Sequence, residues 1–221
     1  YKSYFHNNLL ILVNIKYFMI YFFFKMYSTK IDPKFNKNQN PKIGLIALAS
    51  DYTIEKDFIN VIKDKKIDFF VNRIECFNPL TSENLIKMSE KVTEVTKDIL
   101  PNEKIDCVVY GCTSGTIAAG YQSIEKKIKK AKPEAEVTTP STASIKALKR
   151  LNLNKIAIFT PYPKKLNDEV IDFFKKENFQ ITSNSYFDIA SDIDIGKVDA
   201  NYLYDVLSKM DLKGADALFI S

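Results

Sequence analysis

The stretch IDCVVYGCTSGTIAAG, residues 105–120, carries the strongest fold signal in the chain. It opens with a short apolar run, IDCVVY, which is typical of a strand buried on both faces of a parallel sheet. Small polar residues, TSGT, follow Cys112, and apolar residues then recur at helical spacing. The stretch therefore predicts a strand, a tight turn and a helix, with Cys112 at the carboxyl end of the strand, where open α/β sheets place their ligands.

Strand and helix signals alternate along the rest of the chain. Apolar runs predict strands at 42–50, 66–75, 104–111, 135–140, 154–162, 179–187 and 215–221. Amphipathic spacing predicts helices between them, the clearest at 81–99, and others after Cys112 and near 199–210. This alternation predicts the α/β class, with parallel sheets flanked by helices.

A weak internal repeat divides the chain. KIGLIALA at 42–49 resembles KIAIFTPY at 155–162, and IDCVVYGC at 105–112 resembles ADALFIS at 215–221. The repeat predicts two pseudo-symmetric lobes, 41–140 and 141–221. The last strand has no helix behind it, and the counterpart of Cys112 would fall one residue past Ser221. We therefore expect the second lobe to be C-terminally incomplete.

Residues 1–40 have no turn or capping signals that would connect them to these lobes, and we expect a non-domain extension there. An apolar stretch within residues 1–25 is interrupted by Asn14 and Lys16, is short for a membrane span and has no signal-peptide cleavage site. A more ordinary sequence opens at Met26. We expect residues 1–25 not to be native and not to contribute to the fold; a membrane anchor is the alternative.

The net charge of +5 belongs to this extension, which has six lysines and one acid. Residues 41–221 balance 26 basic against 26 acidic residues, which argues against a nucleic-acid partner. The basic run 126–132 is interpreted as a solvated helix end.

The cysteines are Cys76, Cys107 and Cys112, and the single histidine, His6, lies in the extension. Their spacing predicts neither a metal site nor a disulfide framework, and a histidine-assisted triad is excluded from residues 41–221. Reduced thiols suggest a cytoplasmic protein. Cys107 is expected in the core, and no role is assigned to Cys76.

Cys112 is the candidate reactive residue. Backbone N–H groups of Thr113, Ser114 and Gly115 would lie near a helix N-terminus, where they bind carboxylates and favour a thiolate near neutral pH. Gly115 would also let a substrate approach the backbone. The alternative is a small buried cysteine with a structural role.

Four motifs in order carry a family resemblance: GLIALASDYTIEKDF at 44–58, YGCTSGT at 110–116, TPYPKKLNDEV at 160–170 and ADALFIS at 215–221. Together they resemble the maleate isomerase and arylmalonate decarboxylase branch of the Asp/Glu racemase superfamily. The CTSGT stretch is most similar to the ectoine-utilisation racemase-like proteins. The resemblance implies an active site between two lobes, no cofactor and a pair of catalytic cysteines. The first cysteine matches Cys112, and the second would follow Ser221.

The resemblance also implies substrate-binding positions. Asp51 stands where maleate isomerases carry an asparagine; an ionised Asp51 would favour a cationic substrate group, although it could simply cap a helix. Thr160 and Tyr162 would face the site from the second lobe, or merely form a turn. Asp192 is a further polar candidate.

These features predict a cysteine-dependent racemase or isomerase acting next to a carboxylate of a small amino acid or dicarboxylate, in ectoine catabolism, with this chain inactive by itself. A maleate cis–trans isomerase, an arylmalonate-type decarboxylase and a non-catalytic binding protein on the same fold are the alternatives. The expected partner is a small carboxylate or amino acid, with no nucleic acid and no membrane; a homo-oligomer stays open.

Overall fold

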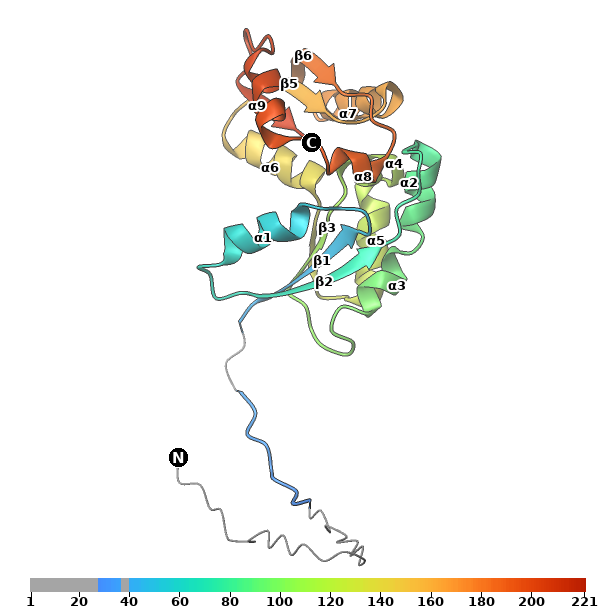
Figure 1. The fold of residues 1–221 in the computed structure, drawn as a ribbon, viewed down its shortest axis with the longest axis vertical. Coiled ribbons are helices and arrows are strands. Elements are labelled where there is room, and N and C mark those ends of the chain that lie inside the picture. The colour runs from blue at the N-terminus through green and yellow to red at the C-terminus, as the bar shows by residue number, and fades with distance from the viewer. Residues whose placement is uncertain (1–27, 37–39) are drawn as a thin grey trace, which may run out of the picture. The chain divides into compact units, whose positions relative to one another are not determined.

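The computed structural model describes residues 28–36 and 40–221 (Figure 1). One compact unit runs from Gln39 to Ser221. The expectations for residues 1–25 lie outside the described residues. Within the described residues, none of the helices has the length and apolar character needed to cross a membrane.

The first sheet has four parallel strands in the order β2-β1-β3-β4. They are β1 Lys42–Leu48, β2 Asp68–Ile74, β3 Cys107–Tyr110 and β4 Glu136–Thr138. Strand β1 lies in the middle, and its residues 44–48 are all buried, as the apolar run predicts.

The second sheet has three parallel strands in the order β6-β5-β7. They are β5 Lys155–Thr160, β6 Gln180–Tyr186 and β7 Ala217–Ile220. Strand β5 is again central, and residues 156–160 are buried. The expectation of parallel sheets flanked by helices is therefore confirmed.

Equivalent hydrogen bonds mark the internal repeat. The Asp106 carboxylate accepts from the backbone N–H of Lys42 at 2.8 Å, and Asp216 accepts from Lys155 at 2.9 Å. Each aspartate thus ties the start of its sheet's third strand to the start of its first. Beyond the other ends, Gly111 N–H donates to Ile46 and Ser221 N–H donates to Phe159.

The helices follow the predicted order. Their bounds are α1 Ile54–Ile62, α2 Ser82–Ser89, α3 Val92–Lys97, α4 Thr113–Ala119, α5 Tyr121–Ala131, α6 Pro140–Arg150, α7 Lys164–Lys176, α8 Asp192–Ile195 and α9 Ala200–Ser208.

Two predicted helices are each split in two. The segment 81–99 breaks at Glu90 and Lys91, whose N–H groups bond three residues back to Lys87 and Met88 and so tighten the turn. The helix after Cys112 breaks at Gly120, whose φ of +79° ends α4. Amphipathic spacing passes through both breaks, which is why the sequence predicts continuous helices.

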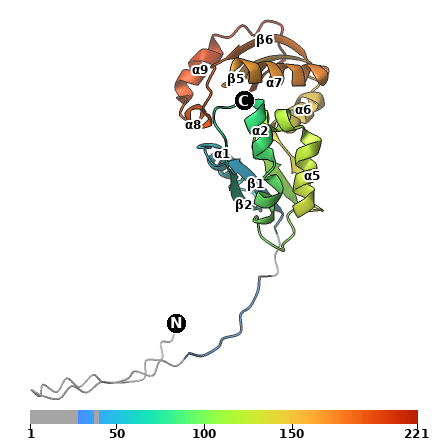
Figure 2. The same ribbon diagram turned by 90° about the vertical axis from the view of Figure 1, so that its right-hand side faces the viewer.

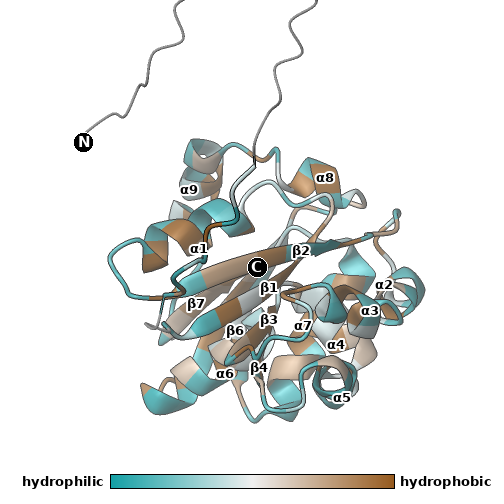
Figure 3. Ribbon diagram, turned by 90° about the horizontal axis from the view of Figure 1, so that it is seen from below, coloured by the Kyte–Doolittle hydropathy of each residue, from teal (hydrophilic) through white to brown (hydrophobic). Residues whose placement is uncertain are grey.

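The two faces of the first sheet are covered differently (Figures 1 and 2). Helices α2, α3, α4 and α5 bury one face in a large core that also takes in residues of α7 and the second sheet. Helix α1 covers part of the other face, where Leu45, Ala47 and Val109 form a small cluster with Ile54 and Phe58 packed against it. Figure 3 shows apolar colour along the strands and mixed colour on the helices around them. The arrangement leaves the carboxyl ends of both sheets available for a site.

Candidate active site

A cavity of about 730 Å³ lies at the carboxyl ends of the strands of both sheets. Loops after β1 and β3, the start of α1, the loops after β5 and β6, and helices α8 and α9 surround it. The lining residues are Leu48, Asp51, Tyr52, Thr53, Ile54, Lys56, Asp57, Gly111, Cys112, Thr113, Ser114, Pro140, Phe159, Pro161, Tyr162, Phe187, Asp192, Ile195, Gly196, Val198, Ala200, Leu203 and Ser221.

Cys112 is the N-cap residue of α4 and borders this cavity. Its Sγ accepts a hydrogen bond from Gly115 N–H at 3.2 Å and lies 3.8 Å from Ser114 Oγ. The carbonyl of Cys112 accepts from Thr116 Oγ1 at 2.7 Å, which fixes the first turn of α4. The residue is 5% exposed, so the thiol is held firmly at the cavity floor.

Burial raises the pKa of the Cys112 thiol from its ordinary 9.0 to about 12. The Gly115 N–H and the Ser114 side chain lower this pKa, but desolvation outweighs them. The expectation of a partial thiolate near neutral pH is therefore wrong for the protein without substrate. Burial also raises the pKa values of Cys76, to about 11, and Cys107, so none of the three is activated in this state.

Gly115 has a different role from the one expected. It does not line the cavity, so it does not admit a substrate to the backbone. A Cβ at this position would stand 2.8 Å from both Cys112 Sγ and Tyr110 Oη. Glycine is required here because two side chains occupy the space that its own would need.

Thr113, Ser114 and Tyr162 are brought together at the cavity. Tyr162 reaches from the β5–α7 connection of the second sheet and is 8% exposed. Its Oη lies 2.7 Å from Ser221 Oγ. Burial raises the pKa of Tyr162 to about 12, and the nearby Cys112 raises it further while Ser221, Ser114 and Thr113 lower it. A neutral phenol thus faces the thiol loop from the opposite sheet.

Asp51 caps the start of α1. Its Oδ1 accepts from the backbone N–H of Thr53 at 2.7 Å and of Ile54 at 2.9 Å. These two hydrogen bonds support the interpretation of Asp51 as a helix cap. The same half-buried carboxylate also lines the cavity. The two interpretations of Asp51 are therefore compatible.

Asp192 opens the short helix α8 and lines the cavity on the side of the second sheet. Its carboxylate accepts from the Ser50 hydroxyl, and its N–H donates to Asn78 Oδ1 at 3.0 Å. Burial raises the pKa of Asp192, and Asp51 adds to the rise while Ser50 opposes it. Ser50 also contacts the Cys76 thiol, so Cys76 lies nearer to the site than the sequence suggested.

Thr160 does not line the cavity. It is fully buried, and its hydroxyl donates to Asn167 Oδ1 at 3.0 Å. Asn167 in turn donates to Asn184 on β6. The predicted contact between Thr160 and the substrate is therefore wrong. The Thr160 side chain instead links β5 to α7.

The sequence reasoning missed Ser50, the side-chain partner of Asp192, and several residues that line the cavity. Ser50 is signalled only by its place after β1, beside Asp51. The lining residues Phe187, Ile195, Gly196 and Leu203 come from segments far along the chain. The sequence Ser191-Asp192-Ile193-Asp194 could have signalled the start of α8, but nothing local signals that it faces Cys112.

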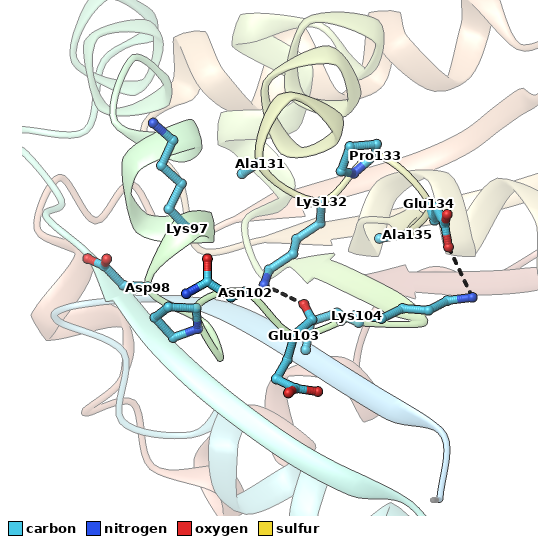
Figure 4. Close-up of a pocket in the computed structure, with 12 residues that line it drawn as sticks. Lys97, Asp98, Asn102, Glu103, Lys104, Ala131, Lys132, Pro133, Glu134 and Ala135 are labelled. Carbon is cyan, nitrogen blue, oxygen red and sulfur yellow. Dashed lines mark hydrogen bonds and ion pairs between the residues drawn. The ribbon is translucent and has the colours of Figure 1, made fainter.

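A second hollow, of about 650 Å³, lies between the end of α5 and the loop before β3, at the amino ends of the strands (Figure 4). Lys132 extends into it and donates to the carbonyls of Leu100 and Glu103, both at 2.8 Å. Lys104 pairs with Glu134 at its rim. The run 126–132 is predicted to be a solvated helix end, but Lys132 is buried, so the prediction is wrong for this residue. No cysteine borders this hollow.

Among the described residues, no group of three or more histidine, cysteine or acidic side chains could hold a metal ion. The described cavity lining offers a thiol, two phenols, three carboxylates, one lysine ammonium and the backbone amides at the start of α4.

Relatives with known activities share the fold. A curated maleate isomerase from Geobacillus stearothermophilus is 23% identical over 194 residues, which are 81% of this chain and 76% of the relative. One from Pseudomonas putida is 25% identical over 193 residues, with the same coverage. They support the isomerase class expected from the sequence.

Solved structures agree with this fold. The maleate isomerase Iso from Pseudomonas putida superposes with a TM-score of 0.73 at 19% identity, covering 80% of this chain and 76% of that one. A double mutant of arylmalonate decarboxylase in the liganded form superposes with a TM-score of 0.71 at 22% identity, covering 82% and 77%.

The family model described as arylmalonate decarboxylase (Amdase) matches residues 81–221, which include the Cys112 loop, Tyr162 and all three strands of the second sheet. The match spans well over half of the sequence, and the chain belongs to the arylmalonate decarboxylase (Amdase) family.

Proposed function

We propose that this protein is a cofactor-independent cis–trans isomerase of the maleate isomerase type. Cys112 would be the nucleophile that adds to a small unsaturated dicarboxylate. The observation that carries the proposal is the position of its thiol, at the N-terminus of α4 on the floor of the cavity at the carboxyl ends of both sheets. Support comes from the curated maleate isomerases and from a structure of the Nocardia farcinica maleate cis–trans isomerase with a covalently bound succinylcysteine intermediate.

The proposed reaction needs one covalent bond. Sγ of Cys112 bonds to one alkene carbon, and the π electron pair moves to the neighbouring carbon, where the attached carboxylate delocalises it. The former double bond is now single and rotates. The delocalised electron pair then re-forms the double bond in the trans geometry. The C–S bond breaks as it does so, and its electron pair leaves on sulfur as a thiolate.

Binding of the substrate carboxylates is assigned to groups around the thiol. The start of α4 offers backbone N–H groups at Thr113 and Ser114, and Tyr162 offers a neutral phenol from the second sheet. These donors stabilise the extra negative charge that the carboxylate takes on when the π electron pair moves to the carbon beside it. The donor set therefore suits a carboxylate next to the reacting carbon.

The raised pKa of Cys112 means that the thiol must lose its proton as the substrate arrives. The negative charge of Asp192, a carboxylate that lines the cavity, raises the pKa of the Cys112 thiol. Burial also raises the pKa of Asp192, so this carboxylate binds a proton more readily. We assign Asp192 as the acceptor, which returns the proton to Sγ after the C–S bond breaks.

A racemase acting on an amino acid is the second candidate. Asp51 and Asp192 both line the cavity, and each carboxylate would attract an ammonium group and oppose a dicarboxylate. This observation favours an amino-acid substrate over maleate itself. A role in ectoine catabolism stays a prediction from the CTSGT motif.

The division into lobes 41–140 and 141–221 is proposed with this function. The two sheets occupy these two ranges, and the cavity takes residues from both. On this view the substrate lies between a thiol lobe and a phenol lobe.

Proton NMR in D₂O separates the candidates. Because the proposed addition uses the thiol of Cys112 alone, maleate incubated with the protein should give fumarate, in contrast to the expectation that this chain is inactive by itself. A racemase should instead exchange the α-proton of an amino acid for deuterium. Cys112→Ser should lower either rate by at least about a thousandfold, because a hydroxyl is far less acidic than a thiol. Cys107→Ser is the matched control and should leave the rate unchanged, since Cys107 does not border the cavity. Equal rates for wild type and Cys112→Ser would refute the proposal, and binding without either reaction would indicate a non-catalytic protein.

A further inference from the structure

The Tyr110 hydroxyl is an unusual feature of the core. Tyr110 ends β3, two residues before Cys112, and is fully buried. Its Oη is the one buried side-chain oxygen or nitrogen without a hydrogen-bond partner of good geometry among the described, non-exposed residues. A buried donor left unpaired costs about 1–3 kcal/mol, so an unpaired phenol in a well-packed core calls for an explanation.

The phenol oxygen lies close to the thiol. Tyr110 Oη and Cys112 Sγ each lie 2.8 Å from the point that a Cβ on residue 115 would occupy, and the Met88 methyl group lies 3.1 Å from the same point. Tyr110 is not among the lining residues, whereas Cys112 is. The phenol therefore stands behind the thiol, on the side away from the substrate.

We propose that Tyr110 is a positioning residue that donates a hydrogen bond to Cys112 Sγ when the sulfur becomes negatively charged. In the resting protein the sulfur is a neutral thiol and a weak acceptor, and the phenol has no strong partner. When the thiol is deprotonated, or when the C–S bond breaks, the sulfur becomes an anion. Tyr110 O–H and Gly115 N–H then both donate to it, and a hydrogen bond to a charged group is stronger than a neutral one.

The surroundings of the pair support this role. Tyr110, Tyr162, Cys76 and Asp192 are the titratable groups that interact with the Cys112 sulfur, from β3, the β5–α7 connection, the segment after β2 and α8. Asp192 and Cys76 oppose a thiolate. Burial first, and then the charge of Cys112, raises the pKa of Tyr110, so the phenol keeps its proton and remains a donor. Tyr162 is engaged with Ser221 on the cavity side.

This inference rests on Cys112 being the reacting group of the proposed function, and its test does not depend on turnover. The rate at which iodoacetamide alkylates Cys112 is measured from pH 7 to 10 by peptide mapping, in wild type and Tyr110→Phe. Loss of the donor should lower the rate at pH 8 about tenfold, equivalent to one unit of pKa. Tyr121→Phe is the matched control, because that phenol donates to Val137 O at 3.0 Å away from the cavity; its Cys112 should react as in wild type.

Thermal unfolding of the same variants supplies the second readout. Tyr110→Phe removes a hydroxyl without a strong partner, so its melting temperature should equal or exceed that of wild type. An unchanged alkylation profile, or a variant that melts several degrees lower or fails to fold, would overturn the inference. Retained turnover in Cys112→Ser would instead refute the proposed function while leaving the alkylation result for Tyr110 intact.

Discussion

The two hollows, at opposite ends of the strands, differ in whether their polar groups have hydrogen-bond or ion-pair partners. At the amino ends, the Lys132 ammonium donates to two carbonyls and Lys104 pairs with Glu134, so charges meet partners (Figure 4). At the carboxyl ends, Cys112 is desolvated, Asp192 is pushed towards its neutral form, and behind them Tyr110 has no strong partner. Burial also lowers the pKa of Lys132, but its ammonium is hydrogen-bonded to two carbonyls and stabilises the fold. Several perturbed groups gathered around one cavity are instead typical of a functional site.

The pH dependence of Cys112 alkylation should show the largest effect. A thiol with a pKa of about 12 is almost fully protonated at neutral pH, so the thiolate fraction grows about tenfold with each pH unit. From pH 7 to 10 the alkylation rate should therefore rise about a thousandfold without a plateau. Peptide mapping after short pulses of iodoacetamide measures the rate, and circular dichroism at each pH checks that the fold persists. A plateau at or below pH 9 would show an unperturbed or activated thiol.

Replacing Lys132 should affect stability and not chemistry. Lys132→Met leaves the carbonyls of Leu100 and Glu103 without their donor and should lower the free energy of unfolding by about 2 kcal/mol. The matched control, Lys104→Met, removes an exposed ion pair in the same hollow and should cost less than about 0.5 kcal/mol. Urea unfolding measures both, and Cys112 alkylation should not change in either. A large change in alkylation would contradict the separation of the two hollows.

Neutralising Asp51 should have a smaller effect, on affinity. Asn can still accept from the N–H groups of Thr53 and Ile54, so Asp51→Asn keeps the helix cap and removes a negative charge from the cavity. The KM for maleate should fall about tenfold if Asp51 opposes a dicarboxylate. Asp199→Asn is the control, because Asp199 caps α9 through Tyr202 N–H and does not line the cavity. A higher KM for maleate in Asp51→Asn would instead assign the carboxylate a binding role.

The sequence predicts the order of strands and helices because buried apolar runs and amphipathic spacing are local signals. It also predicts Cys112 and Tyr162 at the site, since both follow strands whose carboxyl ends meet. It fails for Thr160, whose hydroxyl turns away to Asn167, and for Gly115, whose missing Cβ makes room for Tyr110 and Cys112. Side-chain direction and close approach depend on packing between distant segments, which no spacing in the sequence reports.

The pKa of Cys112 shows the same limit of local reasoning. The TSGT turn and the helix start predict a stabilised thiolate, and the Gly115 N–H does lower the pKa. The residues that bury the sulfur come from several elements, and their desolvation outweighs the local hydrogen bond. A helix N-terminus alone therefore does not predict an activated cysteine.

The central claim is that Cys112, held at the cavity floor, forms the covalent bond to substrate. The most direct test is to incubate the native protein with maleate, quench it with acid, and map succinyl adducts on Cys76, Cys107 and Cys112 by mass spectrometry, with the urea-unfolded chain as control. The account predicts an adduct on Cys112 in the native protein, formed faster than on any cysteine of the unfolded chain. An adduct confined to Cys76 or Cys107, or equal labelling of native and unfolded protein, would contradict it.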